Sequence, residues 1–395
     1  MSNWDTVEQK IQIDTDFRHN VTDYISKIYS TRKKSILPHD INTKDVFEML
    51  QELKWDSEQK FVVFFNFEFV MCLMKLGVTP DRITYIAPSK ESFLEVRDNG
   101  WGKNGMKSIL FDLTTYNRYG KYKKWKRYIM KKIGNLNEFI GVGNIPFTIN
   151  DTDSDNSKKV GNDFIKLMNQ MKKACYIAPF KYHSKTFNEE LIYNKNLIKI
   201  VYHDRKLFNI AGDVYTCHVV LDTQNPTDEF IYRINTSSDV KILDRNKNIS
   251  LAKDLKFTTY FDSSKLTLGE IWTRGTTNDG DLKKNGKYKV VWKLIKDDGD
   301  NSNIEYQYSD VETTTLGQWK VVVPKTGGIA AKLCSPDTSI SYSIIGFPVK
   351  SKESAIKLLN YLRSTEVREL WKALKSNNDN TKAVFSKIPL PDGII

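Results

Sequence analysis

The chain has 395 residues, and its 60 lysines and arginines outnumber its 48 aspartates and glutamates, which gives a formal net charge of +12. A chain of this length buries a sizeable core and has room for roughly two or three domains, which excludes a small scaffold held together by disulfides. The basic balance favours an anionic partner such as nucleic acid.

The cysteines and the N-terminus indicate an intracellular protein. Cys72, Cys175, Cys217 and Cys334 are far apart and form no C-x-x-C pair, a pattern typical of buried thiols in a reducing compartment. The N-terminus "MSNWDTVEQKIQ" is polar, and no segment approaches the roughly 18 apolar residues of a membrane helix. We therefore expect a soluble protein with no membrane partner.

The hydrophobic pattern changes near residue 60. Before it, apolar residues recur at three- and four-residue spacings, which predicts helices, the last of them in "TKDVFEMLQELKW". After it, short apolar runs alternate with helical segments such as "EFVMCLMKLG", which Gly77 is expected to end. The predicted strands cover 60–67, 81–88, 107–113, 137–147, 174–180, 198–204 and 213–223.

This alternation predicts an α/β fold of the Rossmann-like type, with a mostly parallel sheet that binds ligands beyond the carboxyl ends of its strands. After about residue 235 the short alternating runs are separated by turn-rich segments, which predicts a mainly β domain. The segment 352–376 has the spacing of an amphipathic helix or a helix pair. The predicted division is a helical region over 1–58, a Rossmann-like domain over 59–235, a mainly β domain over 236–345 and a helical segment over 346–395.

The sequence Asn144-Ile145-Pro146-Phe147 stands where the fourth predicted strand ends. The exocyclic amine of a purine is a poor nucleophile, because its lone pair is delocalised into the ring. The Asn144 side-chain oxygen and the Ile145 carbonyl together form an acceptor pair that suits both amine hydrogens. Pro146 fixes its own φ and biases the residue before it, and Phe147 offers a face on which an extruded base stacks. These residues make a plausible amine-activating clamp.

"NIPF" resembles the N/D-P-P-Y/F motif of adenine-N6 and cytosine-N4 DNA methyltransferases and the N-I/L-P-Y/F variant of ribosomal RNA adenine dimethyltransferases. The order of segments is also similar, with a first strand "FVVFFNFEF", the catalytic strand later and "YIAPF" after a helix. "FNIAGDVYTCHVVLD" and "VFSKIPLPD" are similar to segments of large adenine methyltransferases of restriction systems and phages. This order, with the cofactor region first, the catalytic motif second and a target-recognition domain last, resembles that of the gamma group of these methyltransferases.

The resemblance implies a DNA adenine-N6 methyltransferase that uses S-adenosyl-L-methionine and no metal. It implies Asn144, Ile145, Pro146 and Phe147 as catalytic residues, and a target-recognition domain over 236–345. It also implies double-stranded DNA as substrate, a possible restriction-system partner, and a cytoplasmic location in a bacterium or a phage-infected host. The residues it implies for the cofactor are Asn66, Glu68 and Asp112.

One departure from the family concerns the cofactor loop. The family usually has F-x-G-x-G after the first strand, whereas this chain has Asn66-Phe67-Glu68-Phe69, and no glycine follows until Gly77. The departure favours an alternative, in which the chain is a non-catalytic nucleic-acid-binding protein on a degenerate methyltransferase scaffold. A second alternative is methylation of adenine in RNA, which the isoleucine of "NIPF" favours.

The segment "KYKKWKRYIMKK" (121–132) is strongly basic. It is either a solvated basic helix or a phosphate-binding surface made by Lys123, Lys124, Lys126 and Arg127, and phosphate contacts would add affinity without reading sequence.

The histidines give no clear metal site. His183, His203 and the Cys217-His218 pair lack the spacing of metal ligands, so we interpret them as core or surface residues.

Overall fold

The computed structural model describes residues 43–98, 100–111, 122–144, 161, 163–180, 191–204, 207, 215–261, 264–275, 277–294, 304–312, 315–327, 330–375 and 379–394. The described residues up to Leu243 form one compact unit, and those from Asp244 form a second. Among these residues, no helix is both long enough and apolar enough to cross a membrane. The four cysteines are free and buried, as the sequence predicts.

The first unit is built on a nine-stranded sheet with the order β3-β2-β1-β4-β5-β7-β6-β8-β9. Strands β1 to β5 pair in parallel, as does β6 with β8, whereas β7 is antiparallel to both β5 and β6. The bounds are β1 Lys60–Phe64, β2 Ile83–Ala87, β3 Lys107–Leu110, β4 Phe139–Asn144, β5 Lys173–Pro179, β6 Leu197–His203, β7 Thr216–Asp222, β8 Glu229–Ile234 and β9 Val240–Asp244.

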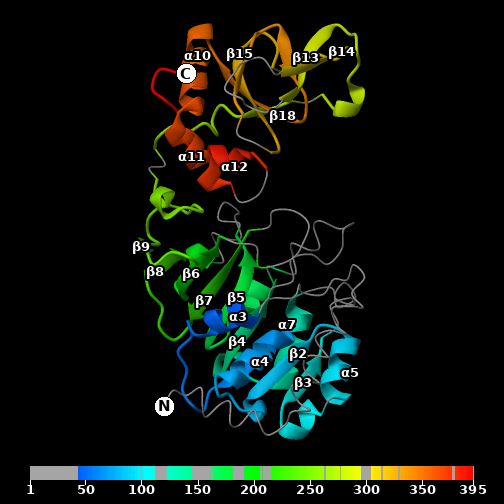
Figure 1. Cartoon of the computed structure of the whole chain (residues 1–395), viewed down its shortest axis with the longest axis vertical. Coiled ribbons are helices and arrows are strands. Elements are labelled where there is room, and N and C mark those ends of the chain that lie inside the picture. Colours follow the sequence, from blue (N-terminus) through cyan, green and yellow to red (C-terminus); the bar gives the residue numbers. More distant parts are fainter. Residues whose placement is uncertain are drawn as a thin grey trace. The chain divides into compact units, whose positions relative to one another are not determined.

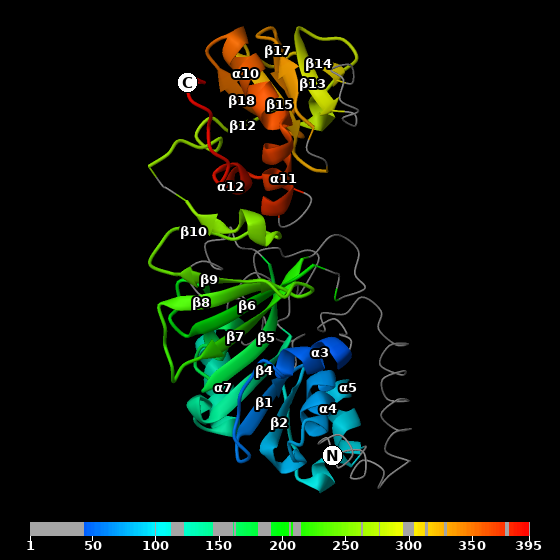
Figure 2. The same ribbon diagram turned by 60° about the vertical axis from the view of Figure 1, so that its left-hand side comes forward.

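Helices cover both faces of this sheet (Figures 1 and 2). On one face, α3 and α4 pack over the strands through a core that includes Met49, Phe69, Val63 and Cys175. The other face carries α7. The helix bounds are α3 Thr43–Leu50, α4 Phe67–Lys75, α5 Lys90–Asp98 and α7 Tyr122–Ile133, with short 3-10 helices over Pro80–Arg82, Trp101–Asn104 and Leu136–Glu138. Two covered faces explain why the strands read as continuous apolar runs.

Gly77 ends α4 as its position in the sequence predicts. It has φ +91°, a left-handed conformation that glycine adopts without a steric cost. Its N–H donates to the Met74 carbonyl at 2.9 Å, and the Val78 N–H donates to the Leu73 carbonyl at 3.0 Å. These bonds satisfy carbonyls that the end of the helix leaves without an intrahelical partner.

The second unit is rich in strands, in agreement with the turn-rich sequence after residue 235. It contains a four-stranded sheet β12-β18-β15-β16, a three-stranded sheet β14-β13-β17 and the pair β10-β11. The bounds are β10 Ile249–Ser250, β11 Thr259–Tyr260, β12 Thr273–Arg274, β13 Tyr288–Leu294, β14 Ile304–Ser309, β15 Trp319–Pro324, β16 Lys332–Cys334, β17 Thr338–Ile340 and β18 Ile344–Val349. Two 3-10 helices cover Leu255–Phe257 and Asp279–Asp281.

The predicted helical segment near the C-terminus is a helix pair. Helix α10 spans Lys352–Arg363 and α11 spans Thr365–Leu374, and the short α12 follows over Lys382–Phe385. Ser364 separates the first two, because its extended backbone ends α10 and its hydroxyl accepts a hydrogen bond from the Val367 N–H at 3.4 Å.

Candidate functional site

The sheet of the first unit has a switch point between β1 and β4. The chain places β2 and β3 on one side of β1 and then returns to place β4 and β5 on the other. The connections therefore leave the two central strands in opposite directions, and ligands of such sheets bind at the carboxyl edge at this point. β1 ends at Phe64 and β4 ends at Asn144, so Asn144 and the residues that follow β1 define the candidate site (Figure 2).

The turn after β1 is tight and strained. Phe65 has φ +72°, which is a rare conformation for a bulky residue. The Asn66 N–H donates to the Phe64 carbonyl at 2.9 Å, which closes a three-residue turn around Phe65. The turn is held from β2, since the Phe65 N–H donates to the Ile86 carbonyl at 3.0 Å and the Tyr85 hydroxyl donates to the Phe65 carbonyl at 3.0 Å. Strain of this kind persists where surrounding contacts over-determine it, often at functional sites.

Gly143 brings the ends of β1 and β4 into close approach. A Cβ atom at this position would lie 2.6 Å from the Phe64 carbonyl oxygen, so a side chain does not fit. The glycine in "GVGN" therefore allows Asn144 to follow directly at the edge of the sheet. Register pairing places Asn144 beside Ile177 of β5.

Two carboxamides occupy this edge. Asn66 and Asn144 are 3% and 1% exposed, and both side-chain oxygens are enclosed away from solvent. A carboxamide offers acceptors and donors at once, so the two residues give an apolar edge the polar groups that recognition of an amine requires. Asn66 also precedes the first turn of α4, in which Glu68 is half-buried.

Aromatic rings fill the space around the turn. Phe65 packs edge-on against Phe164, with ring centroids 4.7 Å apart, and against Phe111 at 6.4 Å. On the other face of the sheet, Phe67 packs against Trp101 at 5.0 Å, and Phe69 is fully buried. Phe67 and Phe69 stand where the F-x-G-x-G pattern would have glycines. The structure therefore has the tight turn around Phe65, followed directly by helix α4, in place of a glycine-rich loop.

The remaining predicted site residues are placed only in part. Ile145, Pro146, Phe147 and Asp112 lie outside the described residues, as does His183. Lys123, Lys124, Lys126 and Arg127 lie in helix α7, and the Arg127 side chain is exposed. The structure brings Asn66 and Asn144 to the ends of neighbouring strands.

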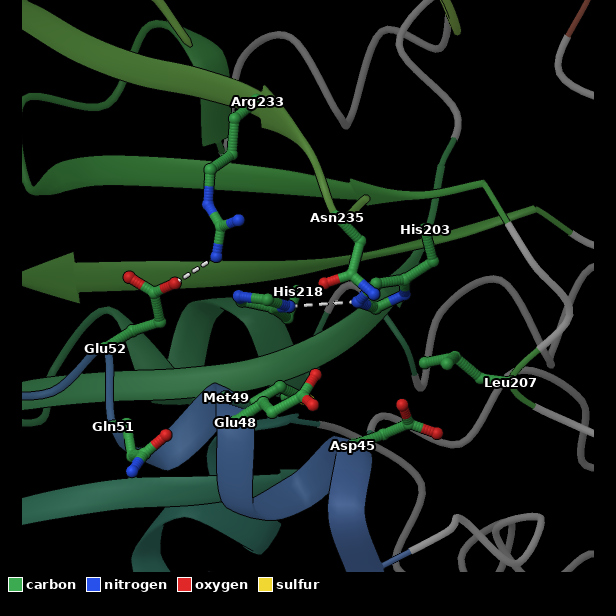
Figure 3. Close-up of a pocket in the computed structure, with 10 residues that line it drawn as sticks. All are labelled: Asp45, Glu48, Met49, Gln51, Glu52, His203, Leu207, His218, Arg233 and Asn235. Carbon is green, nitrogen blue, oxygen red and sulfur yellow. Dashed lines mark hydrogen bonds and ion pairs between the residues drawn. The ribbon is translucent and has the colours of Figure 1, made fainter. Parts of the chain in front are cut away.

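A cavity of about 360 Å³ lies near the same carboxyl edge of the sheet, between α3 and strands β6 to β8 (Figure 3). Its floor holds a pair of buried histidines, His203 and His218, for which the sequence predicts only a place in the core or on the surface. His203 Nε2 lies 2.9 Å from His218 Nδ1, and His203 Nδ1 lies 2.9 Å from the Thr216 hydroxyl. Pairing the predicted strands 198–204 and 213–223 as a hairpin would have brought the two imidazoles together.

Charged groups surround the histidine pair. Both Glu52 carboxylate oxygens are engaged, one by Lys199 and the other by Arg233. Burial raises the pKa of Glu52, but hydrogen bonds from Lys199 and Arg233 outweigh it and hold the pKa below its usual value. Burial, reinforced by the positive charges of Arg233 and Lys199, lowers the pKa of His218 to about 3. His218 is therefore neutral near pH 7.

The second unit carries cations stacked on exposed tyrosines. The Arg274 guanidinium lies 3.3 Å from the ring centroid of Tyr342, which is 43% exposed, and Lys325 lies 4.5 Å from the same ring. Lys289 lies 3.9 Å from the centroid of Tyr306, which is also exposed. Cations beside exposed aromatic faces suit both the phosphates and the bases of a nucleic acid.

No protein-family model matches the chain, and no curated protein matches its sequence. Among solved structures, the type IIL restriction-modification enzyme MmeI in complex with DNA is 8% identical over 87% of this chain and 65% of its own, with a TM-score of 0.50. The type IIG restriction endonuclease BpuSI is 11% identical over 91% of this chain and 59% of its own, with a TM-score of 0.40. The 23S rRNA methyltransferase ErmE is 12% identical over 48% of this chain and 71% of its own, with a TM-score of 0.31.

At 8% identity the comparison with MmeI shows a shared fold. The chain spans 65% of the length of MmeI and 59% of that of BpuSI. The expected fold class is confirmed: the first unit has a Rossmann-like α/β core, and a strand-rich C-terminal part follows it.

Proposed function

We propose that the protein is an S-adenosylmethionine-dependent methyltransferase that modifies the exocyclic amine of adenine in a base flipped out of double-stranded DNA. The observation that carries the proposal is the position of Asn144, a buried carboxamide at the carboxyl end of β4, directly at the switch point of the sheet. The motif "NIPF" begins at this residue. Ligands of parallel sheets bind at this position, so the motif stands where its chemistry would be used.

The residues at the end of β1 fit the amino-acid part of the cofactor. The Glu68 carboxylate suits an ammonium group, and the N–H groups of the first turn of α4 suit a carboxylate. Asn66, the residue that precedes this turn, is proposed as a further contact, and Asp112 is proposed for the adenine end. When bound, the cofactor supplies an electrophilic methyl group, and no metal is required.

The protein's own groups orient the base. The Asn144 side-chain oxygen and the Ile145 carbonyl accept the two amine hydrogens, which favours a pyramidal and more nucleophilic nitrogen. Pro146 restricts the conformation around Ile145, and Phe147 stacks on the extruded base. The amine releases one proton as it gains the methyl group.

DNA binding is proposed for two surfaces. Lys123, Lys124, Lys126 and Arg127 of α7 would contact phosphates, and the second unit would act as the target-recognition domain. MmeI is a restriction-modification enzyme that binds DNA, which supports a restriction-system partner and a cytoplasmic location.

A second candidate function is nucleic-acid binding without catalysis. The observation that favours it is the glycine-free turn, in which Phe65 is strained and Phe67 and Phe69 are buried in the core. A turn of this kind leaves the backbone less room to approach a cofactor than a glycine-rich loop does.

Calorimetric titration with S-adenosylmethionine and transfer of a labelled methyl group to duplex DNA test both candidates. We expect Asn66→Ala to weaken cofactor binding, whereas Asn144→Ala should retain cofactor and DNA binding and lose methyl transfer. A flat titration of the wild type together with intact DNA binding would favour the non-catalytic protein. If the protein methylates RNA but not DNA, the proposed methyl transfer is retained and RNA replaces DNA as the substrate.

A further inference from the structure

The cavity between α3 and strands β6 to β8 is a second candidate binding site, separate from the Asn66 and Asn144 edge. The helix side contributes the carboxylates of Asp45 and Glu48, and the sheet side contributes Arg233, Asn235 and His218 (Figure 3). A volume of about 360 Å³ is near the lower end of the roughly 300–1,000 Å³ of ligand pockets, so it suits one small molecule.

The floor of the cavity offers an unused hydrogen-bonding atom. His218 is 2% exposed, and its Nε2 atom has no hydrogen-bond partner within the described chain. The other ring nitrogen is engaged by His203, and the ring is neutral because its pKa is lowered to about 3. Depending on the tautomer, Nε2 is either a donor or an acceptor, and in both cases a buried polar atom without a partner is costly.

The two walls have opposite hydrogen-bonding character. The carboxylates of Asp45 and Glu48 only accept, and Figure 3 shows them on the side of α3. Arg233 only donates, and one of its terminal nitrogens is held by Glu52, so the guanidinium is fixed while its other N–H groups make no hydrogen bond to the described residues. A ligand that fits must have N–H donors on one edge and acceptors on another.

We propose that this cavity binds a guanine base. Guanine carries donors at N1 and N2 on one edge, which suit the carboxylate wall, and acceptors at O6 and N7 on the other, which suit Arg233 and His218. Met49 and Leu207 add apolar surface for the ring.

Other ligand classes fit the walls less well. Adenine lacks the pair of adjacent ring and amine donors, and a simple cation would meet the positive charges of Arg233 and Lys199 that lower the pKa of His218. Among the described residues, no group of three histidine, cysteine or carboxylate side chains is arranged to hold a metal ion.

The guanine can belong to a free nucleotide or to a nucleic-acid strand. Asn144, Ile177 and His218 form one row of register partners across β4, β5 and β7, so they point to the same face of the sheet. Two strand spacings separate Asn144 from His218, about 10 Å. A nearby base of a bound strand would therefore come within reach of the cavity, but the proposal does not depend on methyl transfer.

The test is titration calorimetry without S-adenosylmethionine, using guanosine, inosine, 7-deazaguanosine and adenosine as probes. Inosine lacks the N2 amine and 7-deazaguanosine lacks N7, so each removes one predicted contact. We expect guanosine to bind at least about tenfold more tightly than the other three, the loss expected for one charge-assisted hydrogen bond. Absence of guanosine binding, or equal binding of adenosine, would overturn the proposal.

Two variants assign the contacts. Glu48→Gln should weaken guanosine binding and abolish the difference between guanosine and inosine. Lys44→Gln is the matched control, because it removes the exposed 4.0 Å ion pair of Lys44 with Glu48 and leaves the carboxylate in place. Unchanged discrimination in Glu48→Gln, with an unchanged melting temperature, would exclude the carboxylate contact and with it the proposed site.

Competition separates the two sources of guanine. Displacement of a fluorescent guanosine probe by guanosine monophosphate alone indicates a free nucleotide. Displacement by a single-stranded oligonucleotide that contains one guanine, but not by the same strand with adenine there, indicates a base within nucleic acid. Displacement by neither would contradict a guanine site.

Discussion

The Tyr85 hydroxyl donates a hydrogen bond of 3.0 Å to the carbonyl of Phe65, the residue that has a positive φ at the end of the first strand. Tyr85 is 1% exposed and belongs to strand β2. A buried side chain of β2 therefore holds the strained turn that follows its neighbour β1. This turn fixes the position of Asn66 and the start of α4. The candidate cofactor edge is thus built on this pair.

Tyr85→Phe tests the pair directly. The substitution retains the ring and removes the hydroxyl, so the buried Phe65 carbonyl loses a donor. We expect the free energy of unfolding to fall by about 1–3 kcal/mol, measured by chemical denaturation. Tyr306→Phe is the control, because Tyr306 is 41% exposed, and it should change stability little. Equal effects of the two substitutions would contradict the role of the Tyr85 hydroxyl.

The strain at Phe65 should make a glycine variant more stable than an alanine variant, the reverse of the usual order of stability. Phe65→Ala and Phe65→Gly both lose the packing against Phe164, but only glycine adopts φ +72° without a steric cost. We expect Phe65→Gly to be more stable than Phe65→Ala by about 1 kcal/mol in matched denaturation experiments. An alanine variant as stable as the glycine variant would show that the turn is not strained.

The buried His218 makes stability depend on pH. Its pKa is about 3 in the folded protein against an ordinary histidine pKa of 6.5, so the unfolded chain binds the proton more readily. The stabilising contribution is complete above pH 6.5 and is lost as the pH falls toward 3, at up to about 1.4 kcal/mol for each pH unit.

Denaturation curves between pH 7.5 and 5 measure this dependence, since the lowered pKa of Glu52 places its own titration below this interval. His218→Gln removes the titrating group and should flatten the slope. The same slope in this variant would assign the dependence to another residue.

Arg274 is expected to contribute to nucleic-acid binding through charge. Its guanidinium stacks on the exposed ring of Tyr342. If it contacts a phosphate, Arg274→Gln should weaken DNA binding and reduce the slope of log K against log salt by about 0.9. Arg97→Gln changes an exposed residue of α5. It serves as the control and should leave the slope unchanged. Fluorescence anisotropy over a range of salt concentrations measures both, and equal slopes in all three proteins would exclude a phosphate contact.

Local pattern predicted much of the first unit. The seven predicted strands agree with β1 to β7 to within a few residues, the stop at Gly77 is confirmed, and Asn144 stands at the end of its strand as expected. The order and direction of the strands in the sheet were predicted less completely, because they depend on strand pairing. β7 enters the sheet antiparallel between β5 and β6, which periodicity does not reveal because buried parallel and antiparallel strands have similar apolar runs.

The sequence by itself determined which segments form strands and helices and which polar residues follow the strands, because hydrophobic periodicity and glycine conformation depend on near neighbours. Only the tertiary structure decided which side chains meet. Glu52, just after α3, and Arg233 of β8 are 181 positions apart, and they pair because α3 packs against the sheet. Likewise the positive φ of Phe65 is imposed by Tyr85 and Ile86 of another strand. Strand register and the packing of helices on the sheet bring such distant groups into hydrogen-bonding range, and no local pattern encodes either of them.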